Sequence, residues 1–280
     1  MLKNSLAVGV FDSGLGGLTA VREIKKILPN EDIIYFGDTG RLPYGTRSPE
    51  IVKKYACDDM NFLLTNSVKA VLVACGTVSS TALSLLKETF DVPVIGVVEP
   101  ASKAACEASK SGKIAVLATP STIRSGAFET SIKQMRKDAE VLGIGCPLFV
   151  PLIENGYLEK DNVVTNIIAK EYVSKLASFK PDTIILGCTH YPMIADIVKD
   201  IAEELIGGVE IIDSGKCAAE ALKLYLDENN CASTSGGSTT YFVSDRPHDF
   251  SSTASLFLGE AVENVTQINI DEYLYNPNKD

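Results

Sequence analysis

Short apolar runs alternate with longer amphipathic segments along most of this chain. The runs are rich in Val, Ile and Leu, and the run at residues 70–74, Ala-Val-Leu-Val-Ala, contains no polar position. Continuous apolar runs of this length are typical of strands that are buried on both faces of a parallel sheet. The pattern predicts strands near residues 6–11, 32–37, 69–75, 92–98, 113–118, 182–187, 209–213 and 239–243.

The segments between these runs have the apolar periodicity of helices. The predicted helices cover residues 18–28, 49–66, 122–137, 161–177 and 215–228. We expect residues 145–156, which are broken by Gly and Pro, to be irregular. Strands that alternate with helices in this way favour an α/β fold of two similar domains with doubly wound, mainly parallel sheets.

The chain also contains an internal repeat. In the first half, a strand that ends at Asp12 is followed by a strand that ends at Cys75. In the second half, a strand that ends at Thr119 is followed by one that ends at Cys188. Ligands of open α/β sheets bind beyond the carboxyl ends of the strands. Two related halves, each with a thiol at that edge, therefore predict a shared site with two thiols.

Two thiols on opposite sides of a carbon atom could invert a stereocentre, because one removes the α-proton and the other returns a proton. A helix start after each strand would favour the thiolate form of Cys75 and Cys188. His190 could hold or relay a proton beside Cys188. The alternatives are that both cysteines are small buried hydrophobes and that His190 caps a helix or lies in the core.

A glycine-rich segment at residues 12–17, Asp-Ser-Gly-Leu-Gly-Gly, follows the first strand and opens a helix. Its backbone N–H groups suit a carboxylate or a phosphate. It is not a dinucleotide-binding fingerprint, because Thr19 stands where the last Gly or Ala belongs. Asp12 could instead serve only as an N-cap, with help from Ser13.

Two further segments could supply contacts to a ligand. Residues 38–45 follow a strand and contain Tyr44 and Gly45, although Gly and Pro would also suit a tight turn. Glu154 could reach the site or cap the turn at residue 156. The Asp-Thr-Gly and Asp-Ser-Gly triplets resemble those of aspartic proteases, but the helical segments argue against that all-β fold.

Composition narrows the class of protein. The 280 residues carry a formal net charge of −10, which repels nucleic acid. No apolar run is long enough to span a membrane, and the apolar N-terminal run is too short for a signal peptide. The seven scattered cysteines favour reduced thiols and hence a cytoplasmic protein. The lone Cys-Thr-His triplet lacks a second pair of metal ligands, so we expect no metal.

Six motifs of this chain resemble those of the glutamate racemases in the aspartate/glutamate racemase family. They are GVFDSGLGGL at residues 9–18, YFGDT at 35–39, PYG at 43–45, ACGT at 74–77, PVIGV at 93–97 and LGCTHYP at 186–192. They occur in the expected order and span most of the chain, and the last motif is highly specific to this family.

The resemblance implies two α/β domains, residues 1–98 with 209–280 and residues 99–208, with the site between them. It implies that Cys75 and Cys188 are the acid and base, assisted by Asp12 and His190, without pyridoxal phosphate or metal. The implied substrate contacts are Asp12, Ser13, Tyr44, Gly45, Gly76, Thr77, Glu154, Thr189 and His190.

The expected reaction interconverts L- and D-glutamate and supplies D-glutamate for peptidoglycan. The expected partner is this small substrate, with neither nucleic acid nor membrane, and the chain could form a homodimer. Alternatives are racemisation of aspartate or another amino acid, a related decarboxylase or maleate-type isomerase, and a binding protein without turnover.

One position departs from the family pattern. Gly76 stands where relatives commonly carry Asn after the first cysteine. Loss of a hydrogen bond to a charged ligand costs about 1.5–3 kcal/mol. We therefore expect Gly76→Asn to stay folded and to lower the KM for glutamate.

Overall fold

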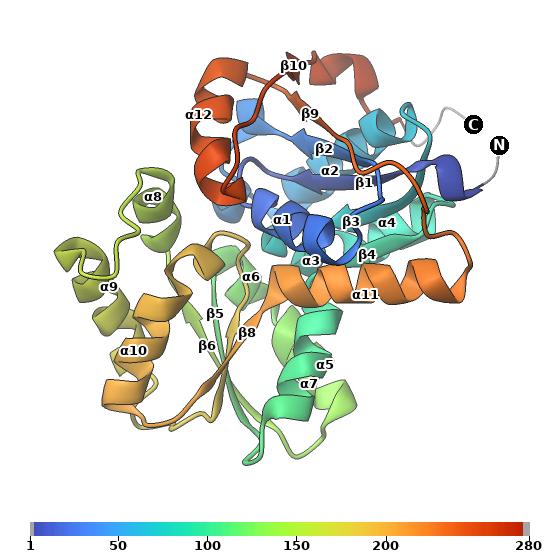
Figure 1. Cartoon of the computed structure of the whole chain (residues 1–280). Helices are drawn as coiled ribbons and strands as arrows, with labels where there is room; N and C mark the ends of the chain where they lie inside the picture. Colours follow the sequence, from blue (N-terminus) through green and yellow to red (C-terminus); the bar gives the residue numbers. More distant parts are fainter. Residues whose placement is uncertain (1–2, 277–280) are drawn as a thin grey trace.

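The computed structural model describes residues 3–276 and contains two parallel β-sheets. The first has the order β10-β9-β2-β1-β3-β4 and the second the order β6-β5-β7-β8 (Figure 1). Every strand pairing is parallel, which confirms the predicted α/β fold with two sheets. The strands are β1 (Ala7–Asp12), β2 (Ile33–Gly37), β3 (Val68–Val73), β4 (Val94–Gly96), β5 (Lys113–Ala118), β6 (Glu140–Gly145), β7 (Thr183–Leu186), β8 (Glu210–Asp213), β9 (Thr239–Val243) and β10 (Val265–Gln267).

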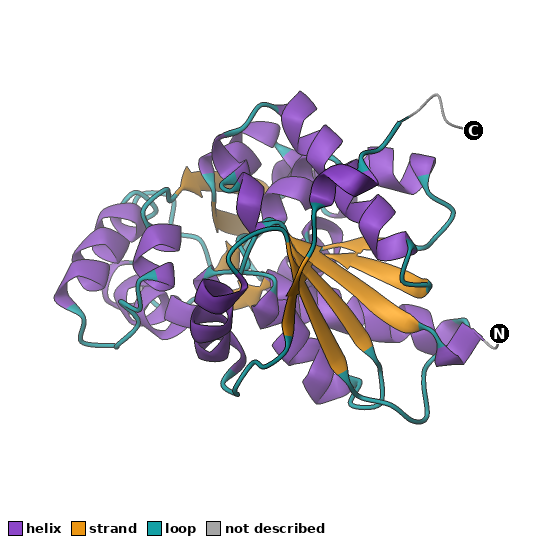
Figure 2. Ribbon diagram, turned by 90° about the horizontal axis from the view of Figure 1, so that it is seen from above, coloured by secondary structure: helices purple, strands orange, loops and turns teal. Residues whose placement is uncertain are grey.

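Helices cover the sheets on both sides (Figure 2). They are α1 (Leu18–Ile27), α2 (Pro49–Leu64), α3 (Gly76–Thr81), α4 (Leu83–Thr89), α5 (Val98–Ala108), α6 (Pro120–Ser125), α7 (Ala127–Met135), α8 (Phe149–Glu154), α9 (Val163–Ser174), α10 (Ala195–Leu205), α11 (Ser214–Glu228) and α12 (Pro247–Leu258). Short 3₁₀ turns are η1 (Lys3–Ser5), η2 (Thr39–Arg41), η3 (Tyr44–Thr46), η4 (Tyr191–Ile194) and η5 (Ile270–Tyr273). In residues 3–276, no helix is long and apolar enough to cross a membrane.

One apolar core runs from the first sheet into the second. Successive side chains of a strand point to opposite faces of its sheet. On one face of β1 and β3, Val10 and Leu72 belong to a cluster that also contains Leu117 of β5 and Leu186 of β7. Helix α11 packs against both α1 and α5 at this junction (Figure 1). The shared core holds the strand ends of the two sheets at one place.

The structure corrects the sequence prediction at several elements. Residues 145–156 are not wholly irregular, because α8 occupies 149–154. Pro151 fits there, since N–H groups in the first turn of a helix need no intrahelical acceptor. The helix predicted at 122–137 is two helices, α6 and α7, separated by Gly126 in the left-handed conformation with φ of 66°. Strands β6 and β10 were not predicted.

The predicted division of the chain at about residues 98 and 208 stays a prediction. The first sheet contains strands from residues 7–96 and 239–267, and the second contains strands from residues 113–213. Strand β8, which follows the predicted second boundary, is hydrogen-bonded to β7 of the second sheet.

Candidate active site

A cavity of about 470 Å³ lies where residues from the carboxyl ends of both sheets meet. Its size is in the usual range for a small-molecule site. All the residues that the sequence singled out line this cavity, namely Asp12, Ser13, Tyr44, Gly45, Cys75, Gly76, Thr77, Glu154, Cys188, Thr189 and His190. They come from segments as far apart as residues 12 and 190, so the fold brings them together.

The two cysteines occupy corresponding places in the two sheets. Cys75 lies two residues after β3, which pairs with β1, and Cys188 lies two residues after β7, which pairs with β5. The backbones around them are in contact, since a β-carbon built on Gly76 would lie 3.8 Å from the Cα of Cys188. Both thiols are nearly buried, with 6% and 7% of the residues exposed, and both line the same cavity.

The surroundings of Cys75 hold its thiol in the protonated form. Cys75 caps α3 and its Sγ lies 3.7 Å from the Ser13 hydroxyl. Burial, with the nearby Asp12 carboxylate, raises the pKa of Cys75 to about 12, although hydrogen bonds from backbone N–H groups oppose the shift. The sequence prediction that the start of a helix favours a thiolate is therefore wrong for Cys75. Burial outweighs the end of a helix only six residues long.

Cys188 lies beside a histidine that is paired with a carboxylate. The Sγ of Cys188 is 3.7 Å from Nδ1 of His190, and Nε2 of His190 is 3.0 Å from Oε1 of Glu154. Burial lowers the pKa of His190, but the bonds to Cys188 and Glu154 outweigh it and raise this pKa to about 10. His190 is therefore an imidazolium at neutral pH and places a positive charge beside the sulfur of Cys188.

A buried ionic cluster holds the loop that carries Tyr44 and Gly45. Arg41 forms ion pairs of 2.6, 2.7 and 2.8 Å with Asp38, Asp58 and Asp59, whose side chains are fully buried. The Tyr44 hydroxyl donates to Asp38 and lies 3.1 Å from Asp59. Burial and the neighbouring Asp38 raise the pKa of Asp59 well above its usual range, although Arg41 opposes this shift.

Sequence reasoning missed other residues of the cavity wall. Thr119 directly follows β5, the strand that corresponds to β1, so the internal repeat could have identified it as the counterpart of Asp12. Its hydroxyl lies 3.2 Å from that of Thr77 and links the two sheets across the cavity. Leu42 and Pro43 lie in the segment 38–45 that the sequence singled out but were not predicted individually. The remaining wall residues were not predicted; they are Thr46, Pro120, Cys146, Pro147, Val150, Pro151 and Asn155.

Gly76 lies at the contact between the two lobes, by which we mean each sheet together with the helices that cover it. A β-carbon on Gly76 would be 2.4 Å from the carbonyl oxygen of Gly187, which is closer than real contacts allow. A side chain at residue 76 therefore requires the turn at Gly187 to shift, and the prediction that Gly76→Asn lowers KM stays a prediction. This position has no room for a side chain in this arrangement of the lobes.

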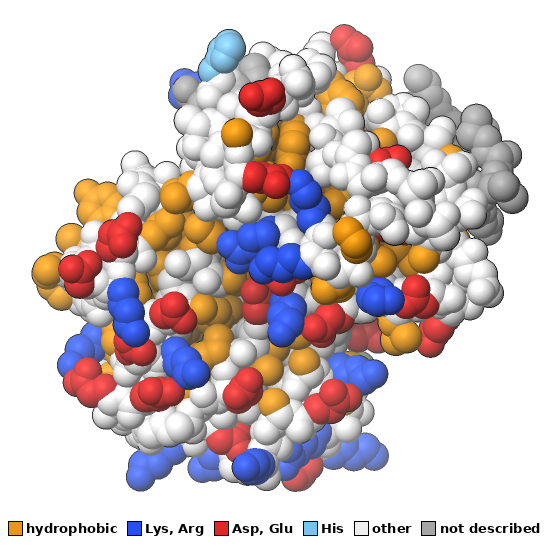
Figure 3. Space-filling model, in the orientation of Figure 1, with side chains coloured by type: hydrophobic (Ala, Val, Ile, Leu, Met, Phe, Trp, Pro, Cys, Tyr) orange, Lys and Arg blue, Asp and Glu red, His pale blue; other side chains and the backbone are white. Residues whose placement is uncertain are grey.

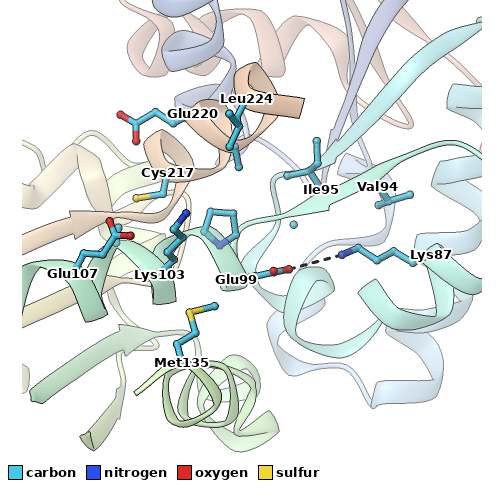
Figure 4. Close-up of a pocket in the computed structure, with 14 residues that line it drawn as sticks. Lys87, Val94, Ile95, Glu99, Lys103, Glu107, Met135, Cys217, Glu220 and Leu224 are labelled. Carbon is cyan, nitrogen blue, oxygen red and sulfur yellow. Dashed lines mark ion pairs between the residues drawn. The ribbon is translucent and has the colours of Figure 1, made fainter. Parts of the chain in front are cut away.

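A second cavity, of about 370 Å³, lies between β4, α5, α7 and α11 (Figure 4). None of the predicted site residues lines it. Its wall mixes charges, with Lys87 lying 3.9 Å from Glu99 and with Lys103, Glu107 and Glu220 nearby (Figure 4). The paired thiols distinguish the first cavity as the candidate active site.

Known proteins resemble this chain in sequence and in fold. Residues 16–222 match the Asp/Glu/Hydantoin racemase family. A glutamate racemase of Geobacter metallireducens is 41% identical over 95% of this chain and 97% of its own length. A crystal structure of Francisella tularensis glutamate racemase in complex with D-glutamate has a TM-score of 0.89, with 36% identity over 97% of this chain and all of its own. The Thermus thermophilus glutamate racemase, in complex with β-chloro-D-alanine, has a TM-score of 0.84, with 36% identity over 96% of this chain and 99% of its own.

The fold and these similarities define a racemase, and the chain belongs to the Asp/Glu/Hydantoin racemase family. It is an isomerase of the amino-acid racemase type. The alternative of a binding protein without turnover is therefore set aside.

Proposed function

We propose that this racemase interconverts L- and D-glutamate with Cys75 and Cys188 as a pair of acid and base. The observation that carries the proposal is that both thiols line one cavity, each just beyond the carboxyl end of a central strand. Support for glutamate as the substrate comes from relatives called glutamate racemase, one of which was solved with D-glutamate.

In one direction, the Cys188 thiolate takes the α-proton of glutamate and becomes a thiol. The Cys75 thiol then donates its proton to the opposite face of the same carbon and becomes a thiolate. In the other direction the two thiols exchange roles. The raised pKa of Cys75 suits its role as the acid, and Cys188, the proposed base, lies beside the His190 imidazolium. The proposed steps need neither pyridoxal phosphate nor a metal ion.

Recognition of the substrate would depend on neutral donors together with the His190 imidazolium. Among the described residues that line the cavity there is no Lys or Arg. The carboxylates of glutamate would therefore be bound by hydroxyls such as those of Ser13, Thr77 and Thr189 and by backbone N–H groups at Gly45 and Gly76. The Asp12 carboxylate is buried at the cavity and would accept the ammonium group.

The test compares wild type with Cys75→Ser and Cys188→Ser by following the optical rotation of L- and D-glutamate. Each substitution replaces a thiol by a hydroxyl that is a much weaker acid, so we expect each rate to fall about 10²- to 10⁴-fold. Cys106→Ser, at a half-buried cysteine outside this cavity, is the matched control. Full activity in either site variant would refute the proposal.

The proposal includes the role and place of the reaction. D-Glutamate from this enzyme would supply peptidoglycan synthesis. All seven cysteines lie within the described residues and are unpaired, which suits the reducing cytoplasm. Racemisation of aspartate, a shorter dicarboxylate, is the alternative, and the same assay with aspartate distinguishes the two. The homodimer stays a prediction.

A further inference from the structure

Three contacts hold the backbone around Cys188 against the first sheet and its helices. The carbonyl of Gly187 touches Gly76, where a β-carbon would be 2.4 Å from it. His190 touches Gly16, where a β-carbon would be 2.3 Å from Nδ1. Between them, the carbonyl of Thr189 accepts a hydrogen bond of 2.7 Å from the hydroxyl of Thr19.

Thr19 replaces a donor that the turn lacks. In this turn, the N–H of Tyr191 donates to the carbonyl of Cys188, and the N–H of Met193 donates to that of His190. The residue between those two donors is Pro192, which has no N–H to offer the carbonyl of Thr189. Since Thr189 is only 2% exposed, water does not easily reach this carbonyl.

The hydroxyl of Thr19 lies near a second carbonyl, which already has another hydrogen-bond donor. This acceptor is the carbonyl of Gly16, at 2.9 Å. That carbonyl already accepts the backbone N–H of Thr19 at 3.1 Å. A hydroxyl has only one proton to donate. We assign this proton to the shorter bond, with the carbonyl of Thr189 as the acceptor.

We propose that Thr19 is a positioning residue, which fixes the turn of Cys188 and His190 relative to Cys75 by supplying the hydrogen bond that Pro192 cannot. Thr19 lies in the first turn of α1, and the backbone segment that it holds follows β7. This proposal rests on the proposed two-thiol reaction. That reaction requires the two thiols to keep a fixed position relative to each other, because a small displacement of a reacting group lowers the rate steeply.

The test compares Thr19→Val, which keeps the shape but removes the hydroxyl, with Thr19→Ser, which keeps the hydroxyl. We expect Thr19→Val to lower kcat about ten- to hundredfold with KM within about twofold, and Thr19→Ser to stay within about threefold of wild type. The primary isotope effect with α-deuterated glutamate should rise more for one enantiomer than for the other, because only one of the two bases is displaced.

The control is Ser102→Ala, which removes a similar bond of 2.8 Å between a buried hydroxyl and a carbonyl within α5. A purely structural loss lowers the folded fraction and leaves the isotope effects unchanged, as we expect for Ser102→Ala. Equal kcat values for Thr19→Val and wild type, or equal losses in Thr19→Val and Thr19→Ser, would overturn the proposal.

A readout that needs no turnover separates this proposal from the proposed function. The rates at which iodoacetamide alkylates Cys188 and Cys75 are measured by mass spectrometry. Thr19→Val should raise the ratio of the Cys188 rate to the Cys75 rate, and Thr19→Ser should restore it. An unchanged ratio contradicts the role of Thr19, whereas a changed ratio without racemisation in wild type contradicts only the two-thiol function.

Discussion

Each thiol has a different polar neighbour, although the halves that carry the thiols correspond. Cys75 faces Asp12, and burial with this carboxylate keeps a proton on the sulfur. Cys188 faces His190, whose pair with Glu154 keeps a positive charge beside the second sulfur. The two sulfurs therefore have different electrostatic surroundings.

The charge of His190 predicts a dependence on pH. A group with a pKa of about 10 keeps its proton below that pH and loses it above, so kcat/KM should fall as the pH rises through about 10. Glu154 raises this pKa, so Glu154→Gln should move the fall to lower pH. The measurement is the pH profile of kcat/KM in both directions. Glu159→Gln, at an exposed position in the loop after α8, is the control and should leave the profile unchanged.

Gly76 gives a prediction about the contact between the lobes. Gly76→Ala adds only a β-carbon, which would meet the carbonyl oxygen of Gly187 at 2.4 Å and push the turn of Cys188 away. We expect kcat to fall about tenfold or more, as for other small misplacements of reacting groups. Gly208→Ala is the matched control, because a β-carbon there meets no atom within 4 Å. A Gly76→Ala enzyme as active as wild type would show that the lobes need not touch here.

At the scale of the element, the loop after β2 depends on its buried ionic cluster. Arg41→Met would leave three fully buried carboxylates without their cation. Removal of one partner of a buried ion pair costs about 3–5 kcal/mol. We expect a clear loss of thermal stability and, because residues 42–46 line the cavity, a raised KM. Arg47→Met, at an exposed arginine of the same loop, should change neither the melting temperature nor KM.

Sequence patterns predicted the strands well where the strand is buried on both faces of its sheet. Strands β1, β3 and β5 are continuous apolar runs and were found within one to two residues. Strand β6 was missed because it lies at a sheet edge, is half-exposed and contains two glycines. The cluster around Arg41 could not be predicted, because Asp58 and Asp59 look like the solvent face of a helix until β2 and its loop cover them.

The candidate site was predictable because its side chains follow strand ends. The repeat placed Cys75 and Cys188 at corresponding positions, and parallel sheets collect strand ends at one edge. The contributions that depend on tertiary contact were not predictable. One of these is the pairing of His190 with Glu154. Another is the crowding at Gly76, a position that the motif indicated only as lacking the usual Asn side chain.

At the scale of the whole molecule, the core common to both sheets limits how the lobes move. Because one cluster of buried apolar side chains spans both sheets, moving the two sheets apart would break apolar contacts at a free-energy cost. The loop at residues 42–46 and helix α8 are more exposed parts of the cavity wall. We infer that substrate enters past these two elements.

Hydrophobic side chains also gather on the surface over α8 and α9 (Figure 3). Val163 and Ile167, with 69% and 62% of each residue exposed, are the most exposed of them, and Leu148 and Tyr157 flank α8. Exposed apolar surface of this kind commonly marks an interaction site. The homodimer stays a prediction, and a dimer that used this surface would bring the partner beside one wall of the cavity.

The central claim is that two different sulfurs act on opposite faces of one carbon, and hydrogen exchange in D₂O tests it most directly. L-Glutamate is incubated with the enzyme in D₂O, and both enantiomers are recovered early and analysed for deuterium at Cα. Two bases predict deuterium in nearly all the D-glutamate and almost none in the remaining L-glutamate. Deuterium that appears equally in both enantiomers, or D-glutamate that keeps the original hydrogen, would contradict the account.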